Sequence, residues 1–214
     1  MSSNATARQQ RTRQNILTAA ERVFLKNGFL GTSMDQVAET AGMSKQTVYA
    51  HFKSKEALFR EVVISMTGTA AHALHEDTEA APDGRPVEDV LMEAAINQLN
   101  VVLTPRLMQL RRMVIGEIER FPDLGVALFD NGPRKSIERF ARLFAHYNDA
   151  GRLDVPDPAN AAAYFNWILM GAPTNAAMLL GNAALPGTRQ RREHAQESVR
   201  IFLSAYGPEA MRGS

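Results

Sequence analysis

The chain has 214 residues, with 24 Lys and Arg against 23 Asp and Glu, a net charge of +1 and no Cys. This length allows a small module beside a larger domain with a core of its own. The absence of Cys excludes disulfides and thiolate catalysis and fits a reducing cytoplasm. Because no apolar run approaches the ~18 residues that span a bilayer, we expect a cytoplasmic protein without membrane segments.

Residues 1–13 are polar and basic, and no apolar segment of a secretion signal follows them. Arg8, Arg11 and Arg13 could contact phosphates or enter a minor groove. They could equally belong to a disordered tail. Either interpretation predicts a flexible basic arm over 1–13.

The first predicted helix begins near residue 14 and ends at Gly28. Its buried side is marked by apolar residues at helical spacing, namely Ile16, Leu17, Ala20, Val23 and Phe24. We expect this helix to pack over the next two and to complete a three-helix head, residues 14–60.

Residues 32–52, TSMDQVAETAGMSKQTVYAHF, predict two short helices joined by a tight turn, a helix-turn-helix. Gly42 stands where the first helix must stop, and a left-handed residue there is least costly as Gly. Thr32 or Ser33 can cap this helix, with Asp35 completing a box-like start from Thr32.

The second of these helices presents the side chains that could contact DNA, and Ser44 can cap it. Val48 and Phe52 are predicted to point inward, which leaves an outward arc of Lys45, Gln46, Tyr49 and Ala50. Lys can reach a guanine or a phosphate, Gln can pair with adenine, and the Ala methyl could touch thymine. Tyr, His and a nearby Lys suit phosphate oxygens, which fix register without reading sequence.

This arc predicts binding to the major groove of DNA. The predicted contacts are Thr32, Ser33, Ser44, Lys45, Gln46, Thr47, Tyr49, His51 and Lys55. The alternative is a solvated face on an ordinary helical hairpin. The charge distribution favours DNA binding over a solvated face, because residues 1–60 hold nine Lys and Arg against four Asp and Glu, whereas the remainder is mildly acidic.

Two stretches, ILTAAERVFLKNGFLGTSMDQVA and VYAHFKSKEALF, resemble the TetR family of bacterial transcription regulators. Ala50 departs from the bulkier residue that the family often has between the Tyr and the His. The resemblance implies a ligand-responsive repressor that binds a pseudo-palindromic operator as a homodimer. A small-molecule effector would bind the larger domain, and the fourth helix would swing the two heads out of register.

The rest of the chain is predicted to be helical, which makes the fold class all-α. We expect an effector-binding and dimerisation domain over 61–207 and a tail over 208–214. Separated by Pro- and Gly-rich breakers, its helices are predicted at about 54–76, 87–103, 105–120, 123–149 with an interruption at 131–133, 157–181 and 188–205.

The helix over 157–181 is rich in Ala, Gly and Asn and carries little charge. A helix that is apolar all round must be buried on more than one side. It could be a central core helix, or it could form a homodimer interface with 188–205, as the resemblance implies. Pro173 should kink it or start a new turn.

The middle helices are predicted to enclose an effector pocket, since Met suits varied apolar shapes. Its candidate walls are Met66, Leu103, Met108, Met113, Phe129, Phe144, Trp167 and Met170. Each of these could instead be an ordinary core residue. Arg106, Arg111 and Arg112 could anchor an acidic group on the ligand or form surface salt bridges.

An enzyme is the main competing class. Without Cys, covalent catalysis would need an activated Ser, and the chain has neither a G-x-S-x-G elbow nor a Gly-rich phosphate loop. His72, His75 and Glu76 could share a metal or be solvated surface. We therefore predict no enzyme activity, no cofactor and no metal site.

Overall fold

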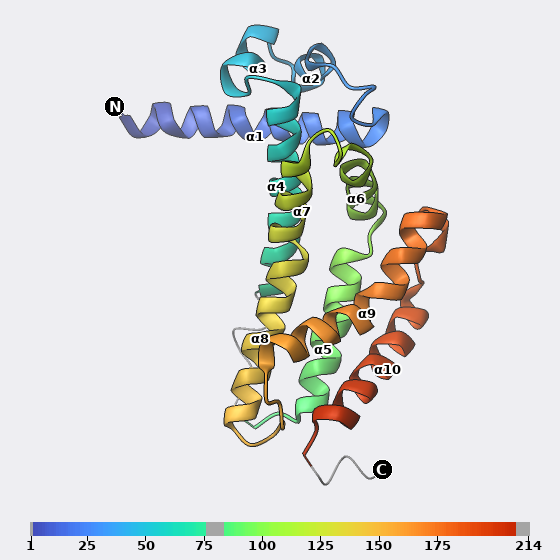
Figure 1. Ribbon diagram of the computed structural model, residues 1–214. Helices are drawn as coiled ribbons and strands as arrows, with labels where there is room; N and C mark the ends of the chain where they lie inside the picture. Colours follow the sequence, from blue (N-terminus) through green and yellow to red (C-terminus); the bar gives the residue numbers. More distant parts are fainter. Residues whose placement is uncertain (1, 76–83, 209–214) are drawn as a thin grey trace. The chain divides into compact units, whose positions relative to one another are not determined.

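The computed structural model describes residues 2–75 and 84–208, without the side chains of residues 2–5 and of His75. Within those ranges every regular element is a helix, which confirms the all-α prediction (Figure 1). The chain divides into two compact units, described separately below. The first comprises Met1–Met66 and Arg112–Ala127, and the second Thr67–Arg111 and Leu128–Ser214.

The first unit, hereafter the head, contains α1 (Ser2–Asn27), α2 (Met34–Ala41), α3 (Lys45–His51) and the beginning of α4 (Lys55–His75). Its core is aromatic. The ring centroid of Phe59 lies 4.7 Å from that of Phe24 and 5.2 Å from that of Phe29. All three side chains are almost completely buried. The stripe predicted on the first helix therefore packs against α4 through a ring cluster.

The flexible arm predicted over residues 1–13 is wrong for the described part, because α1 begins at Ser2. Residues 2–27 contain neither Gly nor Pro, and Ala, Arg and Gln favour the helix. Arg13 donates a hydrogen bond to the Glu61 carboxylate on α4, and its guanidinium lies 5.1 Å from the Phe52 ring centroid. Arg13 therefore braces the head, whereas Arg8 and Arg11 are exposed.

The head extends beyond the boundary predicted at residue 60. It continues to Met66 and takes in residues 112–127 from later in the chain. The Phe121 ring lies 5.4 Å from Phe29, edge to face, and Asp123 forms an ion pair with Arg60 at 3.6 Å. Hydrophobic periodicity locates helices, but it does not reveal which distant segments of the chain pack together.

The second unit, hereafter called the effector unit after the role predicted for it, holds the rest of α4 and most of the later helices. It contains the whole of α5 (Val87–Val102), α8 (Pro133–Asp149), α9 (Pro158–Leu180), η1 (Asn182–Ala184) and α10 (Thr188–Tyr206). The two remaining helices, α6 (Pro105–Glu117) and α7 (Pro122–Asn131), each lie partly in the head, and only residues 105–111 and 128–131 belong to the second unit. The predicted break at 131–133 separates α7 from α8. In contrast, α9 continues through Pro173 as one helix.

Aromatic side chains also centre the core of the effector unit. Phe165 of α9 lies 4.9 Å from Phe140 of α8 and 5.1 Å from Phe202 of α10, measured between ring centroids. Phe144 stacks on Phe202 at 4.4 Å. These contacts hold three helices together around one buried cluster.

Among the described residues, no helix combines the length and the apolar character that crossing a bilayer requires. Residues 209–214 of the predicted tail lie outside the described ranges, as do the His75 side chain and Glu76, two of the candidate metal ligands.

Candidate DNA-binding site and effector cavity

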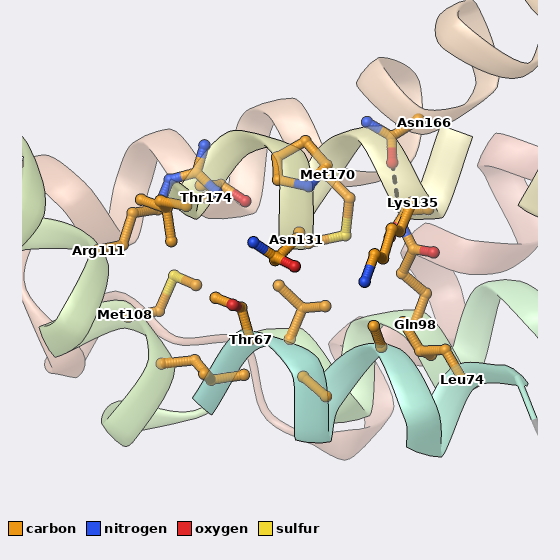
Figure 2. A pocket seen from close by; sticks show the side chains of 18 of the residues that line it. Thr67, Leu74, Gln98, Met108, Arg111, Asn131, Lys135, Asn166, Met170 and Thr174 are labelled. Carbon is orange, nitrogen blue, oxygen red and sulfur yellow. Dashed lines mark hydrogen bonds between the residues drawn. The ribbon is translucent and has the colours of Figure 1, made fainter. Parts of the chain in front are cut away.

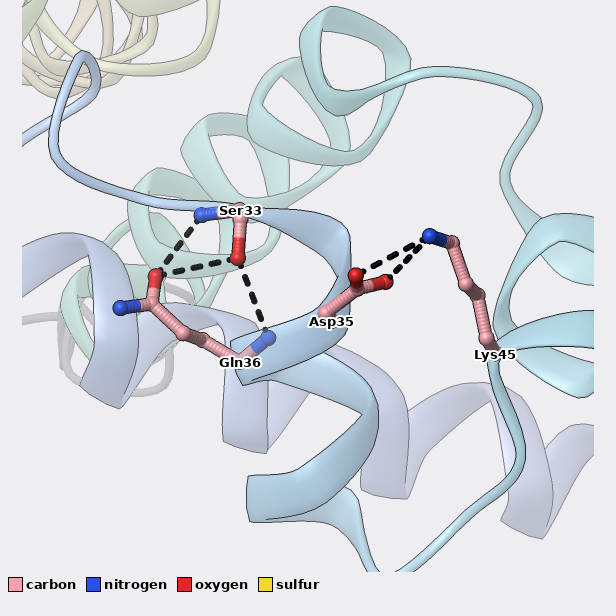
Figure 3. Close-up of polar contacts among 4 residues, drawn as sticks. All are labelled: Ser33, Asp35, Gln36 and Lys45. Atoms are coloured by element: carbon pink, nitrogen blue, oxygen red, sulfur yellow. Dashed lines mark hydrogen bonds and ion pairs between the residues drawn. The ribbon is translucent and has the colours of Figure 1, made fainter.

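The start of α2 is fixed by a capping box between Ser33 and Gln36. The Gln36 N–H donates to Ser33 Oγ at 3.2 Å, and the Ser33 N–H donates to Gln36 Oε1 at 2.8 Å (Figure 3). Of the two predicted caps, Ser33 is therefore the one used. The box predicted from Thr32 to Asp35 is wrong, because the Thr32 hydroxyl is turned inward and donates to the Gly28 carbonyl at 2.7 Å.

The turn between α2 and α3 has the predicted geometry. Gly42 has φ +65° and ψ +33°, a left-handed conformation that closes the end of α2 through its N–H. Ser44 then caps α3, accepting a hydrogen bond from the Thr47 N–H at 3.1 Å. Local backbone hydrogen bonds therefore fix the start of both helices and the end of α2.

The orientation of α3 also follows the prediction. Val48 is completely buried and Phe52 almost so, which anchors the helix against the head. The opposite side exposes Lys45, Gln46, Tyr49 and Ala50. This face combines a cation, an amide, a phenol and a methyl group, a set that can pair with base edges and phosphates.

Lys45 is engaged within the head. Its ammonium lies 2.7 Å and 3.0 Å from the two carboxylate oxygens of Asp35 on α2 (Figure 3). The hydrogen bond to Asp35 raises the Lys45 pKa. Because both side chains are more than half exposed, a DNA phosphate or base can compete with the carboxylate for this cation.

The ammonium of Lys55, which was predicted to contact a DNA phosphate, is bound instead to backbone carbonyls of the head. Its ammonium donates to the carbonyls of Phe29 at 2.9 Å and Thr32 at 3.0 Å, and it lies 4.4 Å from the Phe29 ring centroid. These contacts hold the loop between α1 and α2 against the start of α4. Two carbonyls therefore satisfy the Lys55 charge inside the head.

The remaining predicted contacts differ in accessibility. Thr32 is 3% exposed, so its side chain cannot reach a duplex. Ser33 and Ser44 are exposed but serve as caps, and Thr47 and His51 are half-buried. Most of the predicted set is therefore at least partly accessible, whereas Thr32 is buried and Lys55 is bound to backbone carbonyls.

The effector unit contains a cavity of about 80 Å³ (Figure 2). Helices α4 to α9 all contribute to its walls. Its lining residues are Thr67, Ala70, Ala71, Leu74, Gln98, Val102, Leu107, Met108, Leu110, Arg111, Leu128, Asn131, Gly132, Pro133, Lys135, Ser136, Arg139, Asn166, Trp167, Met170 and Thr174. A space of this size holds several waters or part of an organic ligand.

Three of the predicted walls, Met108, Trp167 and Met170, line this cavity. The other five do not. Met66 and Met113 belong to the head. Leu103 and Phe144 are sealed into the core, and Phe129 is 43% exposed. Size and hydrophobicity do not separate the two groups, because Leu and Met side chains both line the cavity and fill the core.

Polar residues inside the cavity were missed by sequence reasoning, although one signal was present. Arg139 falls within the buried stripe of α8, and Asn166 and Thr174 lie on the buried side of α9. A polar residue on an apolar face is a candidate for internal pairing or ligand binding. Of the three predicted arginine anchors, Arg111 lines the cavity, whereas Arg106 and Arg112 do not.

Comparison with known proteins agrees with both halves of this architecture. Residues 16–62 match the family model described as bacterial regulatory proteins, tetR family. Residues 89–208 match the model described as the C-terminal domain of AefR-like transcriptional repressors. The second match alone spans more than half of the chain.

Individual relatives give the same assignment. The HTH-type transcriptional regulator AcrR of Shigella flexneri is 34% identical over 109 residues, covering 51% of this chain and 48% of AcrR. UidR of Escherichia coli K12 is 35% identical over 79 residues, covering 37% of this chain and 40% of UidR. The chain thus aligns with less than half the length of these curated relatives.

Solved structures align over almost the whole chain. A Mesorhizobium loti protein assigned to the TetR family of transcriptional regulators is 34% identical, with a TM-score of 0.89 and coverage of 94% of this chain and 98% of that one. The flavonoid-responsive regulator FrrA is 28% identical, with a TM-score of 0.75, covering 94% and 99%. The helix-turn-helix head, the helical second unit and these matches together place the chain in the TetR family, whose members are transcriptional regulators rather than enzymes.

Proposed function

We propose that this protein is a transcriptional repressor that binds a pseudo-palindromic operator as a homodimer and is released by a small-molecule effector. The observation that carries the proposal is the face of α3. Val48 and Phe52 bury one side of the helix, and the other side exposes residues of the types that read DNA. Gln46 is the proposed base-reading residue, and Lys45 and Tyr49 are proposed to hold phosphates or neighbouring bases.

A homodimer is proposed because α9 and α10 carry apolar side chains at the surface of the single chain. Residues 158–180 contain no charged side chain. Leu179 is 75% exposed, Leu180 72% and Ile201 40%. A charge-depleted face with large exposed apolar groups favours burial against a partner. Two heads about 34 Å apart would read successive major grooves.

The dimer proposal is tested by Leu180→Glu, with Leu30→Glu as the matched control. Both leucines are 72% exposed, but Leu30 lies in the head. We expect Leu180→Glu to convert dimer into monomer in sedimentation equilibrium, because it buries a charge at the interface. The Leu30 variant should stay dimeric. A wild-type monomer at micromolar concentration would contradict the proposal.

Effector control is proposed to run through α4. Its first residues, including Lys55, pack within the head. Its later residues Thr67, Ala70, Ala71 and Leu74 line the cavity. A ligand in the cavity would therefore touch the same helix that supports the DNA-binding elements. A coupling of ~1–3 kcal/mol would weaken operator binding roughly 5- to 150-fold.

The direct test is retention of genomic duplex fragments by the purified protein, followed by fluorescence anisotropy on the selected sequence. We expect Gln46→Ala to weaken specific binding while leaving binding to random duplex unchanged. Gln10→Ala, at an exposed position of α1, is the matched control. An equal loss of affinity for the specific and the random duplex would mean that Gln46 of α3 does not read the base sequence.

A further inference from the structure

The charge of the cavity lining is one-sided. Arg111, Lys135 and Arg139 are among the lining residues, and none of the described residues that line it is Asp or Glu. Figure 2 shows Arg111 at one end of the view and Lys135 at the other, with Asn131 between them. The walls between these polar groups are mainly apolar, formed by residues such as Leu74, Met108 and Met170.

Arg111 is a half-buried cation of the lining that no described residue neutralises. It is half-buried, and within the described residues it makes no hydrogen bond or ion pair. Burial lowers the pKa of its guanidinium. Arginine nevertheless stays protonated in proteins, so the unfavourable desolvation remains until an anion approaches. A guanidinium also matches carboxylate, sulfonate or phosphate oxygens with paired N–H donors.

Thr174 supplies a second unused polar group. Its side chain is 9% exposed, and its hydroxyl has no hydrogen-bond partner within the described residues. A buried hydroxyl of this kind costs free energy unless a partner arrives. Because Thr174 lines the same cavity as Arg111, a ligand oxygen there can accept a hydrogen bond from this hydroxyl.

A chain of hydrogen bonds fixes the orientation of the side-chain amides of Gln98 and Asn166. Arg139 donates to Gln98 Oε1 at 2.8 Å, and the Gln98 amide nitrogen donates to Asn166 Oδ1 at 2.9 Å. A guanidinium can only donate, so it forces the Gln98 oxygen toward itself and the Gln98 nitrogen toward Asn166. The Asn166 carbonyl is thereby occupied, and its amide N–H groups are the atoms left for a ligand at the cavity wall.

From these observations we propose that the cavity binds an anionic amphipathic effector, a molecule with one acidic oxygen-rich group on an apolar body. The acidic group takes hydrogen bonds from Arg111 and Thr174, and the apolar body lies against Leu74, Met108 and Met170. Neutral or cationic molecules leave the Arg111 charge uncompensated and bind more weakly. This inference rests on the proposed role of the cavity as the effector site.

The test compares two fluorescent dyes of the same aromatic framework. 8-Anilinonaphthalene-1-sulfonate carries an anionic group, and N-phenyl-1-naphthylamine lacks it. Trp167 is the single Trp of the chain and lines the cavity. Energy transfer from its indole to a dye therefore reports binding near the cavity. Affinities are measured on the full-length wild type and on three variants, Arg111→Met, Thr174→Val and Arg142→Met.

We expect Arg111→Met to weaken the anionic dye by roughly tenfold or more, since a charge-assisted hydrogen bond is lost. Thr174→Val should weaken it about fivefold. The neutral dye should change by less than about twofold in either variant. Arg142→Met removes an exposed arginine of α8 that does not line the cavity, and it should leave both dyes unchanged. Far-ultraviolet circular dichroism checks that each variant is folded.

Two outcomes overturn the inference and are distinguishable. If the neutral dye binds as tightly as the anionic dye and Arg111→Met affects both equally, the cavity remains an effector site without preference for anions. If neither dye transfers energy from Trp167, the cavity is not an open ligand site. That result would also remove the proposed effector control, while operator binding by α3 would stand on its separate measurement.

Discussion

The head and the effector unit differ in how their buried polar groups are satisfied. In the head, the hydroxyl of Thr32 and the ammonium of Lys55 both have backbone partners. Within the described residues, no buried polar side-chain atom of the head lacks a hydrogen bond. Among the described residues of the effector unit, the hydroxyls of Tyr147 and Thr174 have no hydrogen-bond partner, and the guanidinium of Arg111 has no counter-ion.

This difference matches the two tasks proposed for the units, DNA reading by the head and ligand binding by the effector unit. A helix that reads DNA must be held in one geometry, and complete internal pairing provides that. A cavity that senses a ligand must keep donors available until the ligand arrives. The free energy lost by leaving them unpaired then becomes available on binding. The following variants test whether the contrast is real.

The largest expected effect is on the aromatic core of the head. Phe59→Ala removes the ring between Phe24 and Phe29. It should lower the free energy of unfolding by about 3–5 kcal/mol, as measured by urea denaturation. Phe59→Leu, which keeps most of the volume, should lose much less. A Phe59→Ala protein of wild-type stability would contradict the account of the head as a tightly packed unit.

Lys55 should contribute to the stability of the head rather than to its affinity for DNA. Lys55→Met removes two charge-assisted hydrogen bonds to backbone carbonyls. It should destabilise the protein by about 1.5–3 kcal/mol. The matched control is Lys53→Met, at an exposed neighbouring position, which should stay within about 0.5 kcal/mol. If Lys55→Met kept full stability and only reduced the salt dependence of DNA binding, the phosphate role predicted from sequence would be reinstated.

The same substitution at two threonines compares the units directly. Thr32→Val removes a hydroxyl bonded to the Gly28 carbonyl and should cost about 1 kcal/mol. Thr174→Val removes a buried hydroxyl that has no partner in the described part of the chain, and it should leave stability unchanged or raise it by about 1 kcal/mol. Thermal unfolding of both variants checks the prediction. A loss of stability at Thr174 equal to that at Thr32 would erase the difference between the units.

The smallest expected effect concerns the exposed pair on the DNA-binding face. Asp35→Asn frees the Lys45 ammonium from its carboxylate partner. Because the free cation can then contact a phosphate, binding to random duplex should tighten slightly, and its salt dependence should steepen by about one phosphate contact. Fluorescence anisotropy at several salt concentrations measures the slope. An unchanged slope would mean that Lys45 does not face the duplex backbone.

The head could be predicted from sequence because its signals are local. Gly42 ends α2, Ser44 caps α3, and Val48 marks the buried side of the recognition helix within a few residues of each other. The breaks before Pro105, Pro122, Pro133 and Pro158 likewise located most later helices. Each of these features depends on neighbours in the chain, so one sequence is enough to read it.

Other features could not be predicted because they depend on contacts between distant segments. The sequence shows the charge of Lys55 and so suggests a DNA contact, whereas the Phe29 and Thr32 carbonyls that bind it lie 26 and 23 residues away. The cavity is defined by where side chains do not fill space, and periodicity carries no such information. Phe144 and Trp167 look alike in sequence, yet only Trp167 lines the cavity.

The central claim is that the exposed face of α3 reads base pairs in the major groove. The most direct test measures the affinity of wild type and Gln46→Ala for the selected operator and for every single-base-pair variant of it. Gln46→Ala is predicted to lose discrimination at one base pair per half-site, by about 1–3 kcal/mol, and to keep it elsewhere. An unchanged discrimination profile in the variant would contradict the claim.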